Sequence, residues 1–333
     1  MGDSIRTTGE LTSQNAPVLG GRCVFDIPRT SDLEQINVLF TGSLQLTVGS
    51  AGLITDGILN LITAVELLAN SGRDVLMTCP FNILVQGNIW RRKRGYLPAI
   101  TQPGVGIAVN AFSVAAAFDV SAFAATRPKD TALRENNYES LQLAFRFAPD
   151  VSGVYQAGFT NTTNVLSMVV SVREIIELPS DPRNPHSASD PVARLLITSN
   201  DIAIAGAGNK IQYKLTPGQG LRGIILRVQS TAVPPVLNDT TLTRTRLYVG
   251  KVQRVDKAGA TIKGEMATSY VINPPTGYYF LDFADRNGSD DHLNDVLNLD
   301  PSHTNGADSI IEFDVSAACT ISVMQVGYIP LAS

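Results

Sequence analysis

The sequence predicts an all-β protein built from two similar domains in tandem. Apolar residues alternate with polar ones in many short segments, which is the period of a strand with one buried face. Glycine and proline are frequent, with 27 and 18 residues among 333, as is typical of a protein with many turns. Similar segments recur in similar order on either side of a proline-rich stretch at 178–192. A chain of this length also suits two domains of roughly 150 residues each.

The first half opens with a clear strand. Val38, Phe40, Leu44, Leu46 and Val48 lie at even positions, with mostly polar residues between them. This alternation predicts one buried and one exposed face.

The next segment, 58–69, is ambiguous by itself. Its apolar residues fit helical spacing as well as a strand. It is followed by the turn sequence Asn70-Ser71-Gly72-Arg73 and by a further apolar segment at 74–77. The strand-rich context favours two strands joined by a glycine-containing turn. Alternation at 141–147 and at 166–172 predicts the last two strands of this half.

The second half repeats this order. Strands are predicted at 210–215 and 223–228, and segment 246–256, closed by a turn at 256–259, takes the place of 58–69 and its turn. A strand pair at 309–316 and 319–330 ends the chain. A short helical turn is expected near 291–297. The pattern favours a duplicated β-sandwich, while a single large sandwich and two unrelated β-domains stay open.

Composition narrows the function classes. The net charge is −4 and the isoelectric point about 5.4, so overall charge does not favour non-specific binding of nucleic acid. Cys23, Cys79 and Cys319 are far apart and odd in number, which predicts neither a disulfide framework nor a Cys-X-X-Cys site. No apolar window reaches the length of a membrane helix, and the first residues lack the apolar core of a signal peptide. We expect synthesis in a reducing cytoplasm.

The sequence offers no catalytic cluster. His186, His292 and His303 all lie in polar, loop-like surroundings, whereas a cupin-type metalloenzyme needs clustered histidines on inward-facing strands. No Gly-X-Ser-X-Gly nucleophile elbow is present. We expect a protein that is not an enzyme and needs no cofactor.

One acidic segment is a candidate calcium site. Asp282, Asp285, Asp290 and Asp291 lie close together in the sequence, and carboxylates are the hard oxygen ligands that Ca²⁺ prefers. Their spacing does not match an EF-hand. A solvated acidic loop with a helix cap is the alternative interpretation.

One basic segment is a candidate contact with an anionic surface. Arg91, Arg92, Lys93 and Arg94 are consecutive and follow the only tryptophan, Trp90. Such a run can bind lipid headgroups or a nucleic-acid backbone without reading sequence. An exposed turn, or ion pairs with a neighbouring subunit, is the alternative.

Two stretches of the chain resemble a known family. Segment 36–77, with a strand containing a small residue, a loop, a strand pair and an Asn-Ser-Gly turn, resembles the opening of the first barrel of double jelly-roll major capsid proteins of tailless icosahedral viruses, particularly phages with an internal membrane. Segment 277–330, with an aromatic strand, a short helix and two final strands, is similar to the close of the second barrel. Together they cover about a third of the chain.

The resemblance implies two eight-stranded jelly-roll barrels in tandem with short helices in loops. On this basis the chain divides into an N-terminal arm at 1–30, a first barrel at 31–178, a proline-rich linker at 179–193 and a second barrel at 194–333. The implied function is a major capsid protein that forms homotrimeric, pseudo-hexagonal capsomers and then a shell lattice around the genome.

The implied partners are other copies of the chain, penton and minor capsid proteins, and an internal lipid membrane, with no sequence-specific nucleic acid. The expected location is the virion, after synthesis in the host cytoplasm. A carbohydrate-binding β-sandwich and a bicupin-type metalloenzyme remain the alternative functions.

Overall fold

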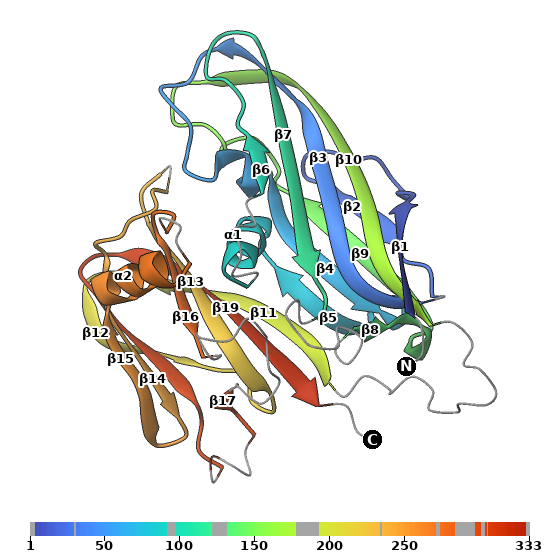
Figure 1. Ribbon diagram of the computed structural model, residues 1–333. Helices are drawn as coiled ribbons and strands as arrows, with labels where there is room; N and C mark the ends of the chain where they lie inside the picture. The colour runs from blue at the N-terminus through green and yellow to red at the C-terminus, as the bar shows by residue number, and fades with distance from the viewer. Residues whose placement is uncertain are drawn as a thin grey trace, which may run out of the picture.

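β-Strands form two barrels that lie side by side in the computed structural model (Figure 1). The structure describes residues 4–29, 31–91, 98–121, 132–177, 193–233, 235–270, 274–283, 297–300, 304 and 306–330. No helix among these residues is long and apolar enough to cross a membrane.

The first barrel consists of two facing sheets. One sheet has the order β1 (Ser4–Leu11), β10 (Thr160–Glu177), β3 (Asp32–Val48), β7 (Val109–Asp119) and β6 (Ala99–Thr101), with β8 (Leu133–Arg134) paired to β3. The other has the order β2 (Arg22–Asp26), β9 (Leu141–Phe147), β4 (Ile62–Ala69) and β5 (Asp74–Cys79). The short helices η1 (Gly57–Leu61), η2 (Asn70–Gly72) and η4 (Glu135–Asn137) connect strands, and α1 (Phe81–Arg91) follows β5.

The second barrel has the same plan. One sheet has the order β11 (Ala193–Ile204), β19 (Cys319–Pro330), β13 (Gly220–Ser230) and β16 (Tyr278–Asp282), with β17 (Leu297–Asn298) paired to β13. The facing sheet has the order β12 (Gly208–Lys214), β18 (Ile310–Val315), β14 (Leu242–Val249) and β15 (Val252–Ala258). Helix α2 (Gly259–Tyr270) follows β15 directly.

The two halves therefore share one topology. Within each barrel the first, last, third and sixth main strands along the chain form one sheet, and the second, seventh, fourth and fifth form the other. Each barrel thus has eight main strands in the jelly-roll order. This confirms the predicted double jelly roll, and it decides for a topological duplication over a single sandwich or two unrelated domains.

Alternating strands supply the core of each barrel. In the first barrel Phe40 packs against Phe112 and Phe147, with ring centroids 5.0 and 5.8 Å apart. Gly42, the small residue of β3, allows this packing, since a side chain there would collide with the backbone oxygen of Val165 and lie 2.8 Å from the Phe112 ring. Phe313, Tyr279 and Leu247 are among the buried residues of the second barrel.

Segment 58–69 contains both a helical turn and a strand. Residues Gly57–Leu61 form a 3₁₀ helix and the strand begins only at Ile62, so the strand prediction is wrong for the first part of the segment. Every residue from Ile58 to Ile62 except Asn60 is buried, which explains why helical spacing was also present. The predicted turn at Asn70–Arg73 is confirmed, with Asn70 and Ser71 at positive φ.

The predicted turn at 256–259 is wrong. The hairpin reverses earlier, between Val249 and Val252, where Gly250 has a φ of 59° that suits glycine. β15 then continues to Ala258 and α2 begins at Gly259. Helices α1 and α2, each placed after the fifth main strand of its barrel, were not predicted.

The predicted domain boundaries differ from the boundaries of the barrels at both the N-terminal arm and the linker. Within the range 1–30, strands β1 and β2 pair with β10 and β9 and so belong to the sheets of the first barrel. Ala193, the last residue of the range 179–193, begins β11. The remainder of that range, and residues 291–296 of the expected helical turn, lie outside the described residues.

Candidate assembly surfaces

The two barrels meet where the edge of one sheet continues into another. β5 and β11 run parallel, with Met77 opposite Ile197 and Thr78 opposite Thr198. This pair joins β2-β9-β4-β5 to β11-β19-β13-β16, and with β17 beside β13 they form one nine-stranded sheet. We call this contact, together with the packing of α1, the cis junction.

Helix α1 fills the cis junction between the barrels (Figure 1). It contacts β7 and β4 of its own barrel and β13 of the second. All residues from Phe81 to Asn88 are buried. Gly87 makes the close approach possible, because a Cβ atom there would overlap Ile225 Cδ1 and lie 2.8 Å from Met324 Cε. The first barrel therefore covers the outer face of the second barrel's sheet around Ile225 and Met324.

A buried polar cluster crosses the same junction. The carboxylate of Asp56 accepts hydrogen bonds from the Tyr278 hydroxyl and, at 3.2 Å, from Gln86 Nε2. Arg227 Nε lies 3.8 Å from the same carboxylate, and Arg227 Nη1 donates to Gln229 Oε1 at 2.5 Å. Burial raises the pKa of Asp56, although Tyr278, Arg227 and Gln86 oppose the shift. The cluster links η1 and α1 of one barrel to β13 and β16 of the other.

The cysteines add only packing. Cys79 Sγ lies 3.0 Å from Met324 Sδ across the cis junction, and burial raises the pKa of the Cys79 thiol. Cys23 and Cys319 are also free and buried. The structure pairs none of the three cysteines in a disulfide.

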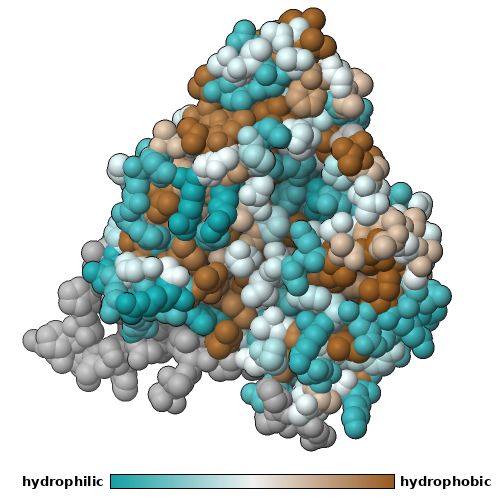
Figure 2. All heavy atoms as spheres, turned by 180° about the vertical axis from the view of Figure 1, so that it is seen from behind, coloured by the Kyte–Doolittle hydropathy of each residue, from teal (hydrophilic) through white to brown (hydrophobic). Residues whose placement is uncertain are grey.

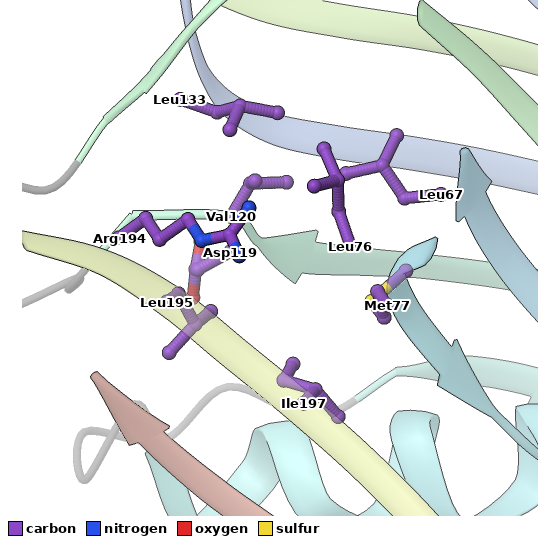
Figure 3. A pocket seen from close by; sticks show the side chains of 9 residues that line it. All are labelled: Leu67, Leu76, Met77, Asp119, Val120, Leu133, Arg194, Leu195 and Ile197. Atoms are coloured by element: carbon purple, nitrogen blue, oxygen red, sulfur yellow. The ribbon is translucent and has the colours of Figure 1, made fainter. Parts of the chain in front are cut away.

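A pocket lies beside the β5–β11 pair (Figure 3). Its walls come from both barrels, and Asp119 and Arg194 are its only charged lining residues. Asp119 accepts a hydrogen bond of 2.8 Å from Gln35 Nε2. The rest of the lining is apolar: Leu67, Leu76, Met77, Val120, Leu133, Leu195 and Ile197. This pocket holds no pair of a nucleophile and a base, so its chemistry is that of an apolar seam between barrels.

The outer face of the first barrel's sheet β1-β10-β3-β7 is very different, since no part of the described chain covers its centre. We call this surface the β3 face. Leu39 is 42% exposed and Val169, opposite it on β10, is 38% exposed. The face is made of Asn37, Leu39, Thr41 and Ser43 of β3, Val165, Ser167, Val169 and Ser171 of β10, and Ala111, Ser113, Ala115 and Ala117 of β7. None of these side chains is charged. Figure 2, the view from behind, shows hydrophobic and hydrophilic side chains intermingled over the first barrel.

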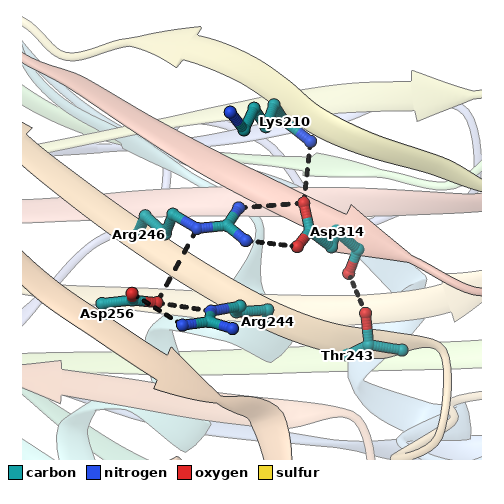
Figure 4. Close-up of polar contacts among 6 residues, drawn as sticks. All are labelled: Lys210, Thr243, Arg244, Arg246, Asp256 and Asp314. Carbon is teal, nitrogen blue, oxygen red and sulfur yellow. Dashed lines mark hydrogen bonds and ion pairs between the residues drawn. The ribbon is translucent and has the colours of Figure 1, made fainter.

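The outer face of β12-β18-β14-β15 carries charge instead (Figure 4). Arg246 binds Asp314 through two hydrogen bonds of 2.9 and 2.6 Å, and Arg244 binds Asp256 through bonds of 2.5 and 2.7 Å. The hydrogen bonds from Arg246 lower the pKa of Asp314. The backbone N–H of Lys210 also donates to Asp314. These ion pairs stabilise a solvated face of the second barrel.

The corresponding sheet of the first barrel carries a smaller cluster. Glu66 of β4 lies 3.2 Å from Arg22 Nη2 and 2.7 Å from Arg146 Nε. Both barrels therefore place ion pairs on the outer face of this sheet.

The predicted calcium ligands are only partly visible. Asp282 ends β16, where its side chain is 6% exposed and lies 3.6 Å from Arg222 Nη1. An arginine thus already balances this carboxylate. Asp285, Asp290 and Asp291 lie outside the described residues, as do His186, His292 and His303. Within the described ranges no three His, Cys, Asp or Glu residues gather in a way that could hold a metal ion, and the calcium site stays a prediction.

The predicted basic contact is visible only at its start. Arg91 is the last residue of α1, and Arg92, Lys93 and Arg94 lie outside the described residues. Positive charge at the C-terminal end of a helix is also favourable for the helix dipole. The structure leaves both interpretations of the run in place.

Sequence reasoning missed the residues that form the cis junction. Gly87, Asp56 and Arg227 lie far apart in the chain and carry no common motif. One signal was present: the run Gly223-Ile-Ile-Leu-Arg-Val228 is almost continuously apolar, which is typical of a strand covered on both faces. The structure shows every residue from Leu221 to Val228 buried.

Comparisons with known proteins identify the fold. Neither a protein-family model nor a curated protein matches the sequence. The structure is similar to the STIV MCP, with a TM-score of 0.70 and 18% identity over 98% of this chain and 97% of that one. It is also similar to the major capsid protein P2 from Bacteriophage PM2, with a TM-score of 0.64 and 11% identity over 98% of each chain. The PBCV-1 virus capsid gives a TM-score of 0.65 and 12% identity over 98% of this chain and 94% of that one. The chain therefore has the double jelly-roll fold found in these viral capsid proteins.

Proposed function

We propose that this chain is the major capsid protein of a tailless icosahedral virus and that it acts by assembling with copies of itself. One observation carries the proposal: a single chain holds two barrels of one topology, joined at the cis junction. The sheet face that this junction covers in the second barrel is uncovered in the first, where it is the β3 face. The similarity to solved capsid proteins along 98% of the chain supports it.

The duplicated barrel explains how one gene product can fill a hexagonal position. A contact between unlike surfaces of identical subunits closes into a ring when the rotation permits. Three copies of a two-barrel chain then place six similar barrels around the ring. Contacts within such a trimer bury a large area, whereas weaker contacts between trimers let a shell close without trapping errors.

The finer partners follow from the same proposal. The virion is the location of the assembled protein, after synthesis in the host cytoplasm. Penton and minor capsid proteins complete the shell, and an internal lipid membrane lies beneath it. In that setting Arg91, Arg92, Lys93 and Arg94 contact anionic headgroups.

A combined alanine substitution tests the basic run. Replacing Arg91, Arg92, Lys93 and Arg94 by alanine is expected to leave the fold and trimer intact and to reduce binding to vesicles of anionic phospholipid, measured by co-sedimentation. Vesicles of zwitterionic lipid are the control. Unchanged binding to anionic vesicles assigns the run to an ordinary surface turn.

Calcium has a separate test. If Asp282, Asp285, Asp290 and Asp291 bind Ca²⁺, adding the ion to chelator-treated protein raises the melting temperature, because a ligand stabilises the state that binds it. Mg²⁺ at the same concentration is the control. No shift with either ion supports a solvated acidic loop.

The carbohydrate-binding sandwich and the bicupin-type enzyme gain no support from the similar solved structures, which are viral capsid proteins. The mass of the native assembly tests the main proposal, by light scattering on a sizing column combined with metal analysis of the same peak. We expect three times 35.6 kDa, or a larger particle. A monomer at micromolar concentration, or a metal-loaded monomer or dimer, overturns the capsid proposal.

A further inference from the structure

The outer faces of two topologically equivalent sheets differ: the one in the second barrel is covered and the one in the first barrel is exposed. In the second barrel, Ile225 and Met324 lie opposite each other on β13 and β19 and are fully buried beneath α1. In the first barrel the equivalent strands are β3 and β10, and their outward pair Leu39 and Val169 is open to solvent. One sheet has a helix over its outer face and the other does not.

The uncovered face is shaped to take a helix. A shallow groove runs over the β3 face, lined by Leu39, Ala99, Ala115, Ala117, Val169 and Ser171. By the strand register, Val169 and Leu39 lie side by side on β10 and β3, and Ala115 and Ala99 continue the row on β7 and β6. A helix with a small-residue surface fits such a groove more closely than one with long side chains.

Helix α2 presents such a surface. It occupies the position of α1 on its own barrel, in contact with β16, β14 and β15. Its exposed residues are Ala260, Thr261, Gly264, Thr268 and Ser269, all small and uncharged. A Cβ atom added at Gly264 would meet nothing within 4 Å. A glycine inside a helix is less favourable than an alanine, and the open space around Gly264 would accept a larger side chain in the single chain.

The charged residues of α2 are already held within their own barrel. Lys263 Nζ lies 2.7 Å from Asp239 and donates to the Pro275 carbonyl at 2.6 Å, while Glu265 binds Lys257 at 2.6 Å. The exposed side of α2 is therefore neutral, as the β3 face is.

The strand edges that meet in the cis junction also have open counterparts. β5 and β11 pair there. Their topological equivalents are β15 and β1, and in the described residues β15 pairs only with β14 and β1 only with β10. The helix, the sheet face and the strand edges of the cis junction each have an equivalent elsewhere in the chain. Within the described residues, α2 does not pack on the β3 face and β15 does not pair with β1.

We propose that α2 of one copy packs into the β3 face of a second copy, repeating between chains the contact that α1 makes with Ile225 and Met324 within the chain. The proposal rests on the capsid function above and specifies the interface that the trimer uses. Helix α2 and the sheet β1-β10-β3 lie on opposite sides of the molecule (Figure 1), so each copy offers one of each surface and the contacts run head to tail.

Substitutions on both surfaces test this interface. Gly264→Gln places a long side chain on α2 while improving its helix propensity, so any loss of association is not a loss of folding. Val169→Lys places a charge in the groove. We expect either change to raise at least tenfold the protein concentration at which trimers form, measured by analytical ultracentrifugation. Val48→Lys, at a residue of β3 that is 48% exposed but lies outside the face, is the matched control and leaves assembly unchanged.

Cross-linking tests the contact directly. The native cysteines are buried, so a chain with Val169→Cys and Gly264→Cys presents two reactive thiols. A short bismaleimide is expected to link this double variant into covalent trimers, and to link a mixture of the two single variants into dimers only.

The outcomes separate this inference from the proposed function. A wild-type chain that is monomeric contradicts the capsid proposal itself. A wild-type trimer that survives Gly264→Gln and Val169→Lys and gives no cross-links overturns the interface while the capsid function stands.

Discussion

Helices α1 and α2 occupy the same place in two barrels of one topology, yet α1 is buried on every side along its described side chains and α2 on one side only. From Phe81 to Asn88 no residue of α1 is exposed, whereas α2 has small, neutral residues open to solvent. The sheets differ in the same way: β13 is buried on both faces and β3 alternates along its second half. The difference shows that the cis junction covers only one of two topologically equivalent surfaces, and the contact proposed between copies would cover the other.

The largest effect is expected from removing the carboxylate at the centre of the cis junction. Asp56→Ala leaves Arg227 buried without its acidic partner and removes an acceptor from Tyr278, which costs about 3–5 kcal/mol of unfolding free energy. Urea denaturation measures the loss. Asp150→Ala, on the surface of the first barrel, is the control, and a loss no greater than that of the control contradicts a structural role for the cluster.

The pH dependence of the same site has a definite sign. Burial raises the pKa of Asp56, so the folded chain holds this proton to a higher pH than the unfolded chain does. Stability from this group is full below the unfolded pKa of about 4 and falls as the pH rises toward the folded pKa. Relative to Asp56→Asn, the wild type should lose unfolding free energy over that window. A constant difference between the two proteins would argue against the raised pKa.

A smaller loss is expected from filling the close helix–sheet contact. Gly87→Leu forces a side chain between α1 and the pair Ile225 and Met324, and overpacking of this kind costs about 1–3 kcal/mol. The measurement is thermal unfolding of the purified chain. Gly264→Leu is the matched control at an open position, and equal destabilisation by both changes would show that α1 is not closely packed.

A still smaller loss of unfolding free energy is expected when an ion pair on the charged face of either barrel is removed. Arg246→Gln removes the bidentate partner of Asp314 and is expected to cost about 1 kcal/mol at neutral pH. Because Arg246 lowers the pKa of Asp314, this contribution is present above the unfolded pKa of about 4 and disappears as the pH falls through the folded value. Arg22→Gln, which removes a more exposed partner of Glu66, should have the smaller effect. The reverse order in chemical denaturation at pH 7 would contradict this ranking.

The smallest effect is a gain. Gly264→Ala adds a methyl group where the isolated chain has open space and should raise the unfolding free energy by about 0.5–1 kcal/mol. The unfolding free energy is measured by chemical denaturation at protein concentrations too low for the chain to associate. A loss of stability under those conditions would mean that Gly264 is already packed within its own chain.

Periodicity predicted most strands but neither main helix. Segments 38–48 and 141–147, in which apolar and other residues alternate over most of their length, and segment 319–330 are predicted as strands, which the structure confirms. Helix α1 was missed because burial on all sides removes the amphipathic pattern, and α2 because its small exposed residues give no contrast with its buried ones. The turn expected at 256–259 failed for a related reason, since the start of α2 was taken for the end of a hairpin.

The sequence by itself determined the all-β class, the two-part layout and the resemblance to double jelly-roll capsid proteins, because these depend on local alternation, turn residues and composition. Only the tertiary structure decided which surfaces are covered. Asp56, Gly87, Tyr278 and Arg227 meet through folding across two barrels, and an exposed Leu39 differs from a buried Ile225 only in what lies above it. Burial of an outer sheet face depends on a neighbour distant in the chain, and short-range patterns do not encode that neighbour.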